Sequence, residues 1–218
     1  MSRIKAILLD FDGTIMNTNQ LIFNSWRHVF RTLANREIEL SEVAPTFGEP
    51  LEETMRRMFP DRDAAEMVDL YRYYQKYVWK ENVHMFPGMK DMLLRLKTMG
   101  YKLCLVTSRI WSTTTQGNMY VFDVADVFDD KVTPDDTKAH KPDPEPCLVA
   151  LNKMDVSADE ALFVGDSKYD IQCAHNAGVK AVLVGWSVCM PEETRVGINK
   201  PDYVIERPED IFAILQQE

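Results

Sequence analysis

Four short apolar runs, each bounded by turn residues, restrict the fold of this chain more than any other feature of its sequence. They occupy residues 4–11, 102–107, 161–164 and 181–186. Such runs are typical of strands buried on both faces, as in a parallel sheet covered by helices. Segments with helical spacing of apolar residues lie between them, at 89–99, 144–154 and 171–177. This alternation predicts a doubly wound α/β core.

Weaker patterns complete the predicted core. Residues 127–133 are a candidate strand, and residues 203–206 and 208–215 end the chain as a strand and a helix. A helix is also expected over residues 111–120, and Thr107 and Ser108 taken singly favour a cap for that helix.

The stretch from about residue 16 to residue 85 interrupts the alternation. It contains amphipathic helical patterns, such as the apolar residues Ile22, Trp26 and Val29, but no convincing buried strand. Because this stretch directly follows the first strand, we expect a helical insertion rather than a separate terminal domain. The predicted division is a core of residues 1–15 and 86–218 with an inserted segment of residues 16–85.

The charge and cysteine content exclude several classes of protein. The formal net charge is -9, whereas binding to nucleic acid or to an anionic membrane surface depends on clustered positive charge. No apolar run approaches the roughly 20 residues that span a bilayer. The four cysteines are scattered without CxxC spacing, which favours reduced thiols rather than a zinc or redox site. We therefore predict a cytoplasmic protein with no nucleic-acid or membrane partner.

Polar residues gather where the predicted strands end. In open α/β sheets, ligands bind at the carboxyl ends of the strands. The predicted strand 4–11 ends in the sequence DFDGT, the strand 102–107 ends in TSR, and the strand 161–164 is followed by GDSKYD. A lysine, Lys141, lies in the loop before residue 144. The residues concerned are Asp10, Asp12, Thr107, Ser108, Arg109, Lys141, Asp166 and Asp170. Four separate stretches of the chain are thus predicted to meet at one edge of the sheet.

These residue types permit phosphoryl transfer. The carboxylates of Asp10, Asp12 and Asp166 would repel one another unless a hard cation lay between them, so Mg²⁺ is the implied cofactor. A carboxylate can attack phosphorus, and a second one can donate and accept protons. Asp10 and Asp12 point the same way along an extended strand and could share these roles. A hydroxyl pair and a lysine could hold the phosphoryl group and offset its charge.

The four motifs DFDGT, VTS, HKPDPEP and GDSKYD, in this order, resemble those of the haloacid dehalogenase superfamily. The resemblance spans the chain, and the insertion is similar to the small helical cap of that superfamily. It implies that Asp10 is the nucleophile and Asp12 the general acid and base. It also implies that Asp10, the backbone carbonyl of Asp12, and Asp166 hold Mg²⁺.

The remaining motif residues take supporting roles by the same resemblance. Thr107, Ser108 and Lys141 would bind the phosphoryl group, and Asp170 would support the metal or orient Lys141. The dehalogenases of the superfamily lack an acid or base where this chain has Asp12, whereas its phosphatases have Asp there. The expected activity is therefore that of a phosphatase.

Within the superfamily the chain is most similar to the phosphoglycolate phosphatase group. The stretches NTNQLIFNSW, TFGEPLEETM, TPDDTKAHKPDPEP and NAGVKAVLVGW resemble still more closely a bacterial pyrophosphatase of that group. Asn17 stands where many relatives have Asp and Arg109 where many have Lys, so the choice of substrate is open. Gly48, in the loop 46–50, and Arg109 are candidate substrate contacts.

Several functions therefore remain to be compared. Phosphoglycolate is the leading substrate, followed by inorganic pyrophosphate and then sugar phosphates. A phosphomutase would use the same residues in a different reaction, and a non-catalytic phosphate-binding protein is the alternative outside enzymes. The sequence leaves open a monomer or a homodimer.

Overall fold

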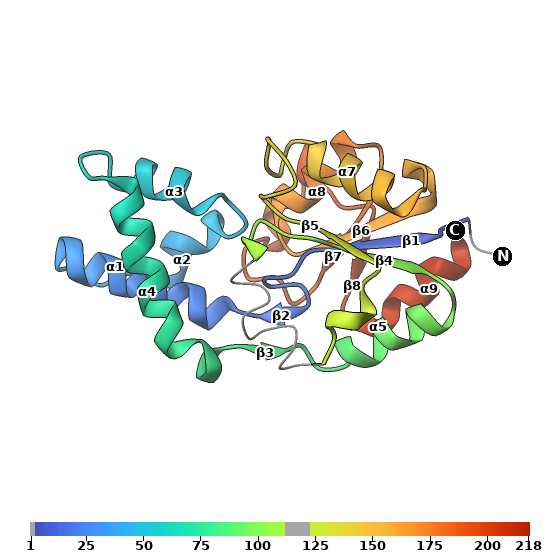
Figure 1. Cartoon of the computed structure of the whole chain (residues 1–218), viewed down its shortest axis with the longest axis horizontal. Coiled ribbons are helices and arrows are strands. Elements are labelled where there is room, and N and C mark those ends of the chain that lie inside the picture. Colours follow the sequence, from blue (N-terminus) through green and yellow to red (C-terminus); the bar gives the residue numbers. More distant parts are fainter. Residues whose placement is uncertain (1–2, 112–122) are drawn as a thin grey trace.

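The apolar runs form one six-stranded parallel sheet (Figure 1). The computed structural model describes residues 3–111 and 123–218, so the predicted helix over 111–120 lies outside the described residues except for Trp111. The strands of the sheet are β1 (Ala6–Leu9), β4 (Lys102–Val106), β5 (Asp130–Val132), β6 (Ala161–Gly165), β7 (Lys180–Val184) and β8 (Tyr203–Ile205). Their order is β5-β4-β1-β6-β7-β8, with parallel pairing throughout.

The strand order changes direction at β1. The strands β4 and β5 follow β1 on one side, and β6, β7 and β8 follow on the other. Leu9 at the end of β1 is in register with Leu105 of β4 and with Val164 of β6. The residues that follow these three strands consequently meet at one edge, at the switch point where doubly wound sheets bind ligands.

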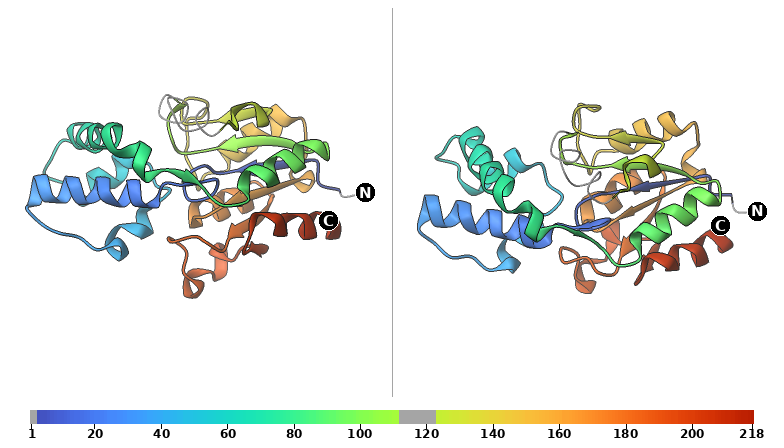
Figure 2. Two further views of the ribbon diagram at one scale, coloured as in Figure 1. Left: turned by 90° about the horizontal axis from the view of Figure 1, so that it is seen from below. Right: turned by 60° about the horizontal axis from the view of Figure 1, so that its bottom comes forward.

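Helices cover both faces of the sheet (Figure 2). The helices α5 (Met89–Thr98) and α9 (Ile211–Gln217) pack on one face, and α7 (Glu145–Met154) and α8 (Lys168–Asn176) pack on the other. Side chains alternate along β1, so that Ile7 and Leu9 enter the first layer while Ala6 and Leu8 enter the second. Every residue of β1 is buried, which explains why the strand reads as a continuous apolar run.

A helical cap follows the first strand and lies at the end of the molecule away from the two termini (Figure 1). Its helices are α1 (Asn19–Ala34), α2 (Leu40–Val43), α3 (Leu51–Met58) and α4 (Ala64–Asn82). They bury a separate apolar cluster in which Trp26 meets Tyr71 edge to face, with ring centroids 5.5 Å apart. The predicted fold class, an α/β core with a small helical cap inserted after the first strand, is confirmed.

The chain crosses between core and cap twice, and the two crossings pair. Strand β2 (Met16–Asn17) is antiparallel to β3 (His84–Met85). Sequence patterns did not predict this ribbon, because two-residue strands are too short to show a period. Smaller differences concern element ends: the predicted strand 127–133 is regular only over β5, and the last predicted helix begins with a 3₁₀ turn, Pro208–Asp210, ahead of α9.

No helix within the described ranges is both long enough and apolar enough to cross a bilayer.

Candidate active site

Three carboxylates meet at the carboxyl edge of the sheet. Asp10 directly follows β1. Its backbone N–H donates to the carbonyl of Val164 over 2.9 Å, which continues the pairing of β1 with β6. Asp166 follows β6, and Asp170 lies in the first turn of α8. Carboxylate oxygens of these three buried residues lie within 4.8 Å of one another. Such an oxygen-rich cluster suits a hard divalent cation.

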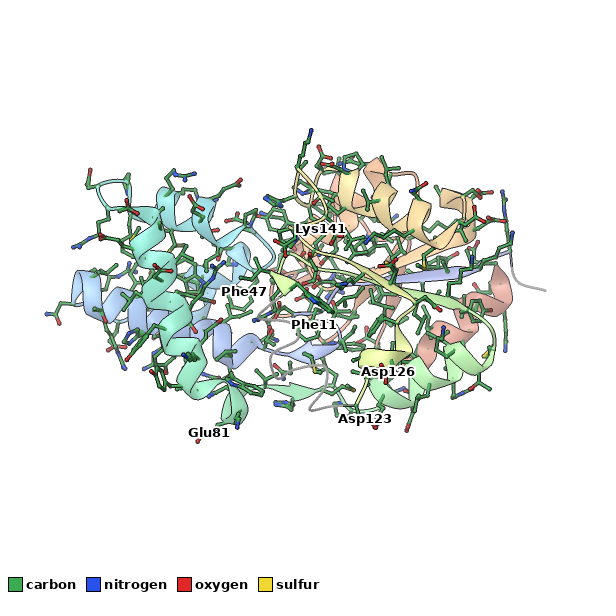
Figure 3. All side chains as sticks on the ribbon, viewed as in Figure 1. Phe11, Phe47, Glu81, Asp123, Asp126 and Lys141 are labelled. Carbon is green, nitrogen blue, oxygen red and sulfur yellow. The ribbon has the colours of Figure 1, made fainter. Side chains whose placement is uncertain are left out.

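The ammonium group of Lys141 lies beside this cluster. Its Nζ is 2.7 Å from Oδ1 of Asp10, 2.6 Å from Oδ1 of Asp170 and 3.1 Å from the carbonyl oxygen of Val106. An ammonium has three N–H donors, so all of them have acceptors here. Lys141, labelled in Figure 3, would therefore contact a phosphoryl group only by exchanging one of these partners.

Asp170 links Lys141 to the start of α8. Its Oδ1 accepts from Lys141, while its Oδ2 accepts from the backbone N–H of Ser167 over 3.0 Å and from the Ser167 hydroxyl over 2.6 Å. Ser167 in turn caps the N-terminus of α8. With both oxygens engaged, Asp170 is placed to hold Lys141 against Asp10.

The electrostatics of the cluster fit a bound cation. Burial raises the pKa of Asp10 to about 7, against the opposing effect of Lys141, and the charge of Asp170 adds to the rise. Burial, followed by the charges of Asp170 and Asp10, also raises the pKa of Asp166. Lys141 keeps its proton because the two carboxylates raise its pKa although burial lowers it. Lys141 offsets only one of three carboxylates, so a divalent cation beside Asp10 and Asp166 would remove the remaining repulsion.

The second aspartate of the motif, Asp12, lies outside this cluster of three carboxylates and pairs with Arg109. Arg109 donates from Nε to Oδ2 of Asp12 over 2.9 Å and from its terminal nitrogen to Oδ1 over 2.6 Å. Burial would raise the pKa of Asp12, but the charge and hydrogen bonds of Arg109 outweigh it and lower the pKa. Arg109, predicted as a substrate contact, is thus bound bidentately to the predicted acid and base.

The predicted hydroxyl pair lies on the same edge, after β4. The hydroxyl oxygen of Thr107 accepts from the backbone N–H of Arg109 over 3.1 Å. The hydroxyl of Ser108 donates to the carbonyl of Gly48 over 3.3 Å, which joins the core to the cap loop. Gly48 has φ +90°, and a Cβ there would lie 2.9 Å from Oγ of Ser167. A side chain at Gly48 would therefore push the loop away from the core.

A second bridge between cap and core was not predicted from the sequence. The Tyr169 hydroxyl of α8 donates to Glu49 of the cap loop, and Arg57 and Thr54 of α3 donate to the same carboxylate. Burial would raise the pKa of Glu49, but hydrogen bonds, first from Arg57 and then from Tyr169 and Thr54, lower it. Tyr169 lies within the motif GDSKYD and Glu49 within the loop 46–50, but neither was predicted as a site residue, and only the structure shows that they meet.

Between cap and core lies a cavity of about 140 Å³. In Figure 3, Phe47 lies on the cap side of this region, with Phe11 and Lys141 on the core side. The core contributes Asp10, Asp12, Thr107, Ser108, Arg109, Ile110 and Asp166, and the cap contributes Asn19, Ile22, Trp26, Thr46, Phe47, Gly48, Glu49, Leu51, Thr54, Tyr71, Arg72 and Gln75. The volume suits a substrate of only a few non-hydrogen atoms beyond a phosphoryl group.

A buried carboxylate cluster with a lysine, and a pair of aspartate and arginine near it, lie at the switch point of a capped α/β sheet, an arrangement typical of phosphoryl-transfer hydrolases. The model of the family described as haloacid dehalogenase-like hydrolase matches residues 7–184. The chain belongs to this family, and it is a hydrolase of the phosphatase type.

Relatives of known name cover nearly the whole chain. Pyrophosphatase PpaX of Bacillus velezensis is 33% identical over 212 residues, covering 97% of this chain and 96% of that protein. A protein of Clostridium perfringens that is provisionally named as the same pyrophosphatase is 36% identical over 216 residues, 98% of each chain.

Solved structures share the fold. A structure from Lactobacillus plantarum, provisionally named a phosphoglycolate phosphatase, has a TM-score of 0.85 and 25% identity and covers 98% of this chain and 100% of its own. A haloacid dehalogenase-like protein of Streptococcus pneumoniae has a TM-score of 0.84 at 24% identity over 99% of this chain and 100% of that chain. The second likeness concerns the fold alone.

Proposed function

We propose that the chain is a Mg²⁺-dependent phosphatase for a small phosphate compound that carries a second anionic group, and that it acts through an aspartyl-phosphate on Asp10. The observation that carries the proposal is the buried cluster of Asp10, Asp166 and Asp170 with Lys141, open to a small cavity beneath the cap.

In the first step an oxygen of Asp10 attacks phosphorus, and the bond from phosphorus to the leaving oxygen breaks. Asp12, which takes up a proton from solvent once its pair with Arg109 has opened, gives that proton to the leaving oxygen. The products are the leaving molecule, an acyl phosphate on Asp10 and a carboxylate on Asp12. Thr107 and Ser108 are proposed to hold the transferred group, with Lys141 offsetting its charge after exchanging a present partner.

In the second step the carboxylate of Asp12 takes a proton from water while the water oxygen attacks phosphorus. The bond between phosphorus and Asp10 breaks, phosphate leaves, and both aspartates return to their starting states. Mg²⁺ held by Asp10 and Asp166, with the Asp12 carbonyl that the family resemblance implies, would offset the charge on the phosphoryl group.

The substrate we propose first is inorganic pyrophosphate, with phosphoglycolate second. The resemblance of the motifs alone had favoured the reverse order. The names of relatives that are 33% and 36% identical over nearly their whole length support placing pyrophosphate first, whereas the cavity lined by Arg72 and Arg109 suits both substrates. Both candidate substrates pair a phosphoryl group with a second anion, which two arginines can bind.

We propose the division that the sequence predicts, with residues 16–85 as the cap and the remainder as the core. The antiparallel pair of β2 and β3 is the proposed hinge. A cap that closes would exclude water from the first step. We propose that the protein is cytoplasmic, which its four free cysteines support, and that it is a monomer or a homodimer.

Phosphate release tests the proposal. Pyrophosphate, phosphoglycolate and a panel of sugar phosphates are to be compared with and without Mg²⁺, with Asp10→Asn as the blank. We expect one of the first two to exceed the panel in kcat/KM, and turnover to require both Mg²⁺ and Asp10. Near-normal turnover by Asp10→Asn contradicts the mechanism. Return of phosphate to the product after priming with a bisphosphate would instead indicate a phosphomutase.

A further inference from the structure

Arg109 occupies both oxygens of Asp12, the residue proposed to act as acid and base. The two contacts, of 2.9 and 2.6 Å, form a bidentate pair in which the Arg109 and Asp12 side chains are 11% and 24% exposed. Bidentate pairs of a guanidinium with a carboxylate are both strong and orienting. The pair therefore decides which way the Asp12 side chain points.

This orientation conflicts with the first chemical step. A general acid must bring an oxygen that bears a proton within hydrogen-bond reach of the leaving atom. A carboxyl group whose two oxygens both face N–H donors of Arg109 presents neither oxygen in that way. The pair of Asp12 and Arg109 must open before Asp12 can protonate a leaving group.

The surroundings of Arg109 indicate what opens it. Arg109 and Arg72 are the two cations among the described residues of the cavity wall, one from the core and one from α4 of the cap. Within the part of the chain that the structure describes, no ion pair or hydrogen bond engages the side chain of Arg72. An anion that enters the cavity therefore meets one unpaired guanidinium and one that can exchange Asp12 for a new oxyanion.

The exchange is energetically reasonable because it replaces one bidentate pair by another. Arg109 is already removed from water by its pairing with Asp12, so binding a phosphate or carboxylate adds little further desolvation. A neutral group in the same place offers no comparable partner, and Arg109 would stay on Asp12.

We infer that Arg109 restrains Asp12 until the second anionic group of the substrate binds Arg109, so that only a substrate with such a group frees the acid. This inference rests on the proposed function and adds a reason for its substrate class. Arg109 is a positioning residue for the acid as well as a ligand for the substrate, and its loss affects the choice between substrates more than binding alone would.

The test compares substrates that differ in the second anion. Pyrophosphate, phosphoglycolate and ethyl phosphate are hydrolysed by wild type, Arg109→Gln and Arg109→Lys, and kcat and KM are measured separately. Ethyl phosphate resembles phosphoglycolate without its carboxylate. Arg109→Gln should raise kcat for ethyl phosphate, because Asp12 is then free without a second anion, and should raise KM for phosphoglycolate by about 30-fold, the value of a bidentate charged contact, with little change in its kcat. Arg109→Lys keeps one positive charge but loses the bidentate geometry of the guanidinium. Its kinetic constants should therefore lie between those of wild type and Arg109→Gln.

Arg72→Gln is the matched control, since Arg72 lines the same cavity without touching Asp12. It should raise KM for the two anionic substrates more than it lowers kcat. Thermal unfolding of every variant shows whether a loss of activity is a loss of folded protein.

Two results are distinguishable. If wild type prefers the anionic substrates but Arg109→Gln lowers kcat for all three by the same factor, the restraint is wrong while the proposed function stands. If wild type hydrolyses the three substrates equally well, or none of them through Asp10, the proposed substrate class itself is wrong.

Discussion

The ammonium nitrogen of Lys141 lies 2.7 Å from Oδ1 of Asp10, although 131 residues separate the two along the chain. Lys141 also holds Asp170, and all three side chains are buried. The contact joins the loop before α7 to the end of the central strand β1. Because Asp10, Asp170 and Lys141 form one buried unit, we expect the stability of the core and the chemistry of the site to depend on each other.

Removal of the Lys141 side chain should therefore lower both the stability of the protein and its turnover. Lys141→Met leaves Asp10 and Asp170 buried without their cation, which costs about 3–5 kcal/mol when one partner of a buried pair is lost. Denaturant unfolding should show this decrease, and turnover should fall with it. Lys97→Met is the control, since Lys97 pairs with Asp129 at a site where the side chains are 33% and 36% exposed, and exposed pairs contribute about 1 kcal/mol or less. Equal unfolding midpoints for the two variants would contradict the prediction.

Gly13 should be essential because of the space beside it. It has φ +75°, and a Cβ there would lie 2.1 Å from Oδ2 of Asp166. Gly13→Ala should displace Asp166 and reduce kcat by about 100-fold, as expected for a catalytic group moved by about 1 Å. Gly100→Ala is the matched control, since Gly100 has φ +89° with no atom within 4 Å of a Cβ. Alanine at either position should lower the free energy of unfolding by a similar amount, about 1–2 kcal/mol, because both glycines have a positive φ. A loss of turnover in Gly13→Ala that Gly100→Ala does not show would therefore support the role of Asp166.

The contact of Tyr169 with Glu49 should favour the closed arrangement of cap and core. Tyr169→Phe removes the hydroxyl that donates to the Glu49 carboxylate. We expect KM for the preferred substrate to rise by about tenfold, equivalent to about 1.4 kcal/mol, with a smaller change in kcat. Tyr77→Phe serves for comparison because Tyr77 is 65% exposed on α4. Identical kcat and KM values for Tyr169→Phe and wild type would contradict a role of this contact in closing the cap.

Acid should destabilise the turn that follows β5. The carboxylate of Asp136 accepts from the backbone N–H and the hydroxyl of Thr133 and pairs with Lys153. Burial would raise the pKa of Asp136, but these hydrogen bonds lower it below its ordinary value of 3.8. A lowered pKa in the folded state stabilises the protein above pH 3.8, and this contribution is lost as the pH falls through the folded value.

The melting temperature measures this contribution. Asp136→Asn should melt below wild type at pH 7, with a loss of about 1 kcal/mol for the hydrogen bonds to Thr133. The difference should shrink as the pH falls below 3.8. A gap between the two melting temperatures that stays constant from pH 7 to acid would show that Asp136 does not titrate with the fold.

Local patterns were sufficient for the fold class. Continuous apolar runs identify the central strands because both faces of each strand must be buried, as they are in β1 and β6. The motif residues could also be identified from the sequence. Carboxylates and hydroxyls that follow several strands of one sheet indicate a ligand site, because ligands bind at the carboxyl ends of parallel strands. Their roles in catalysis stay predictions, as does the division at residues 16 and 85.

The partners of those residues depend on tertiary structure alone. Arg109 meets Asp12 across 97 residues of chain, and Tyr169 meets Glu49 across 120. No local pattern specifies either contact, because the two partners of each pair lie far apart in the sequence. Short motifs in the sequence are thus enough to select the residues of the candidate site. The restraint on Asp12 and the bridge between cap and core arise only when β1, α8 and the cap loop pack together, because their partners come from distant parts of the chain.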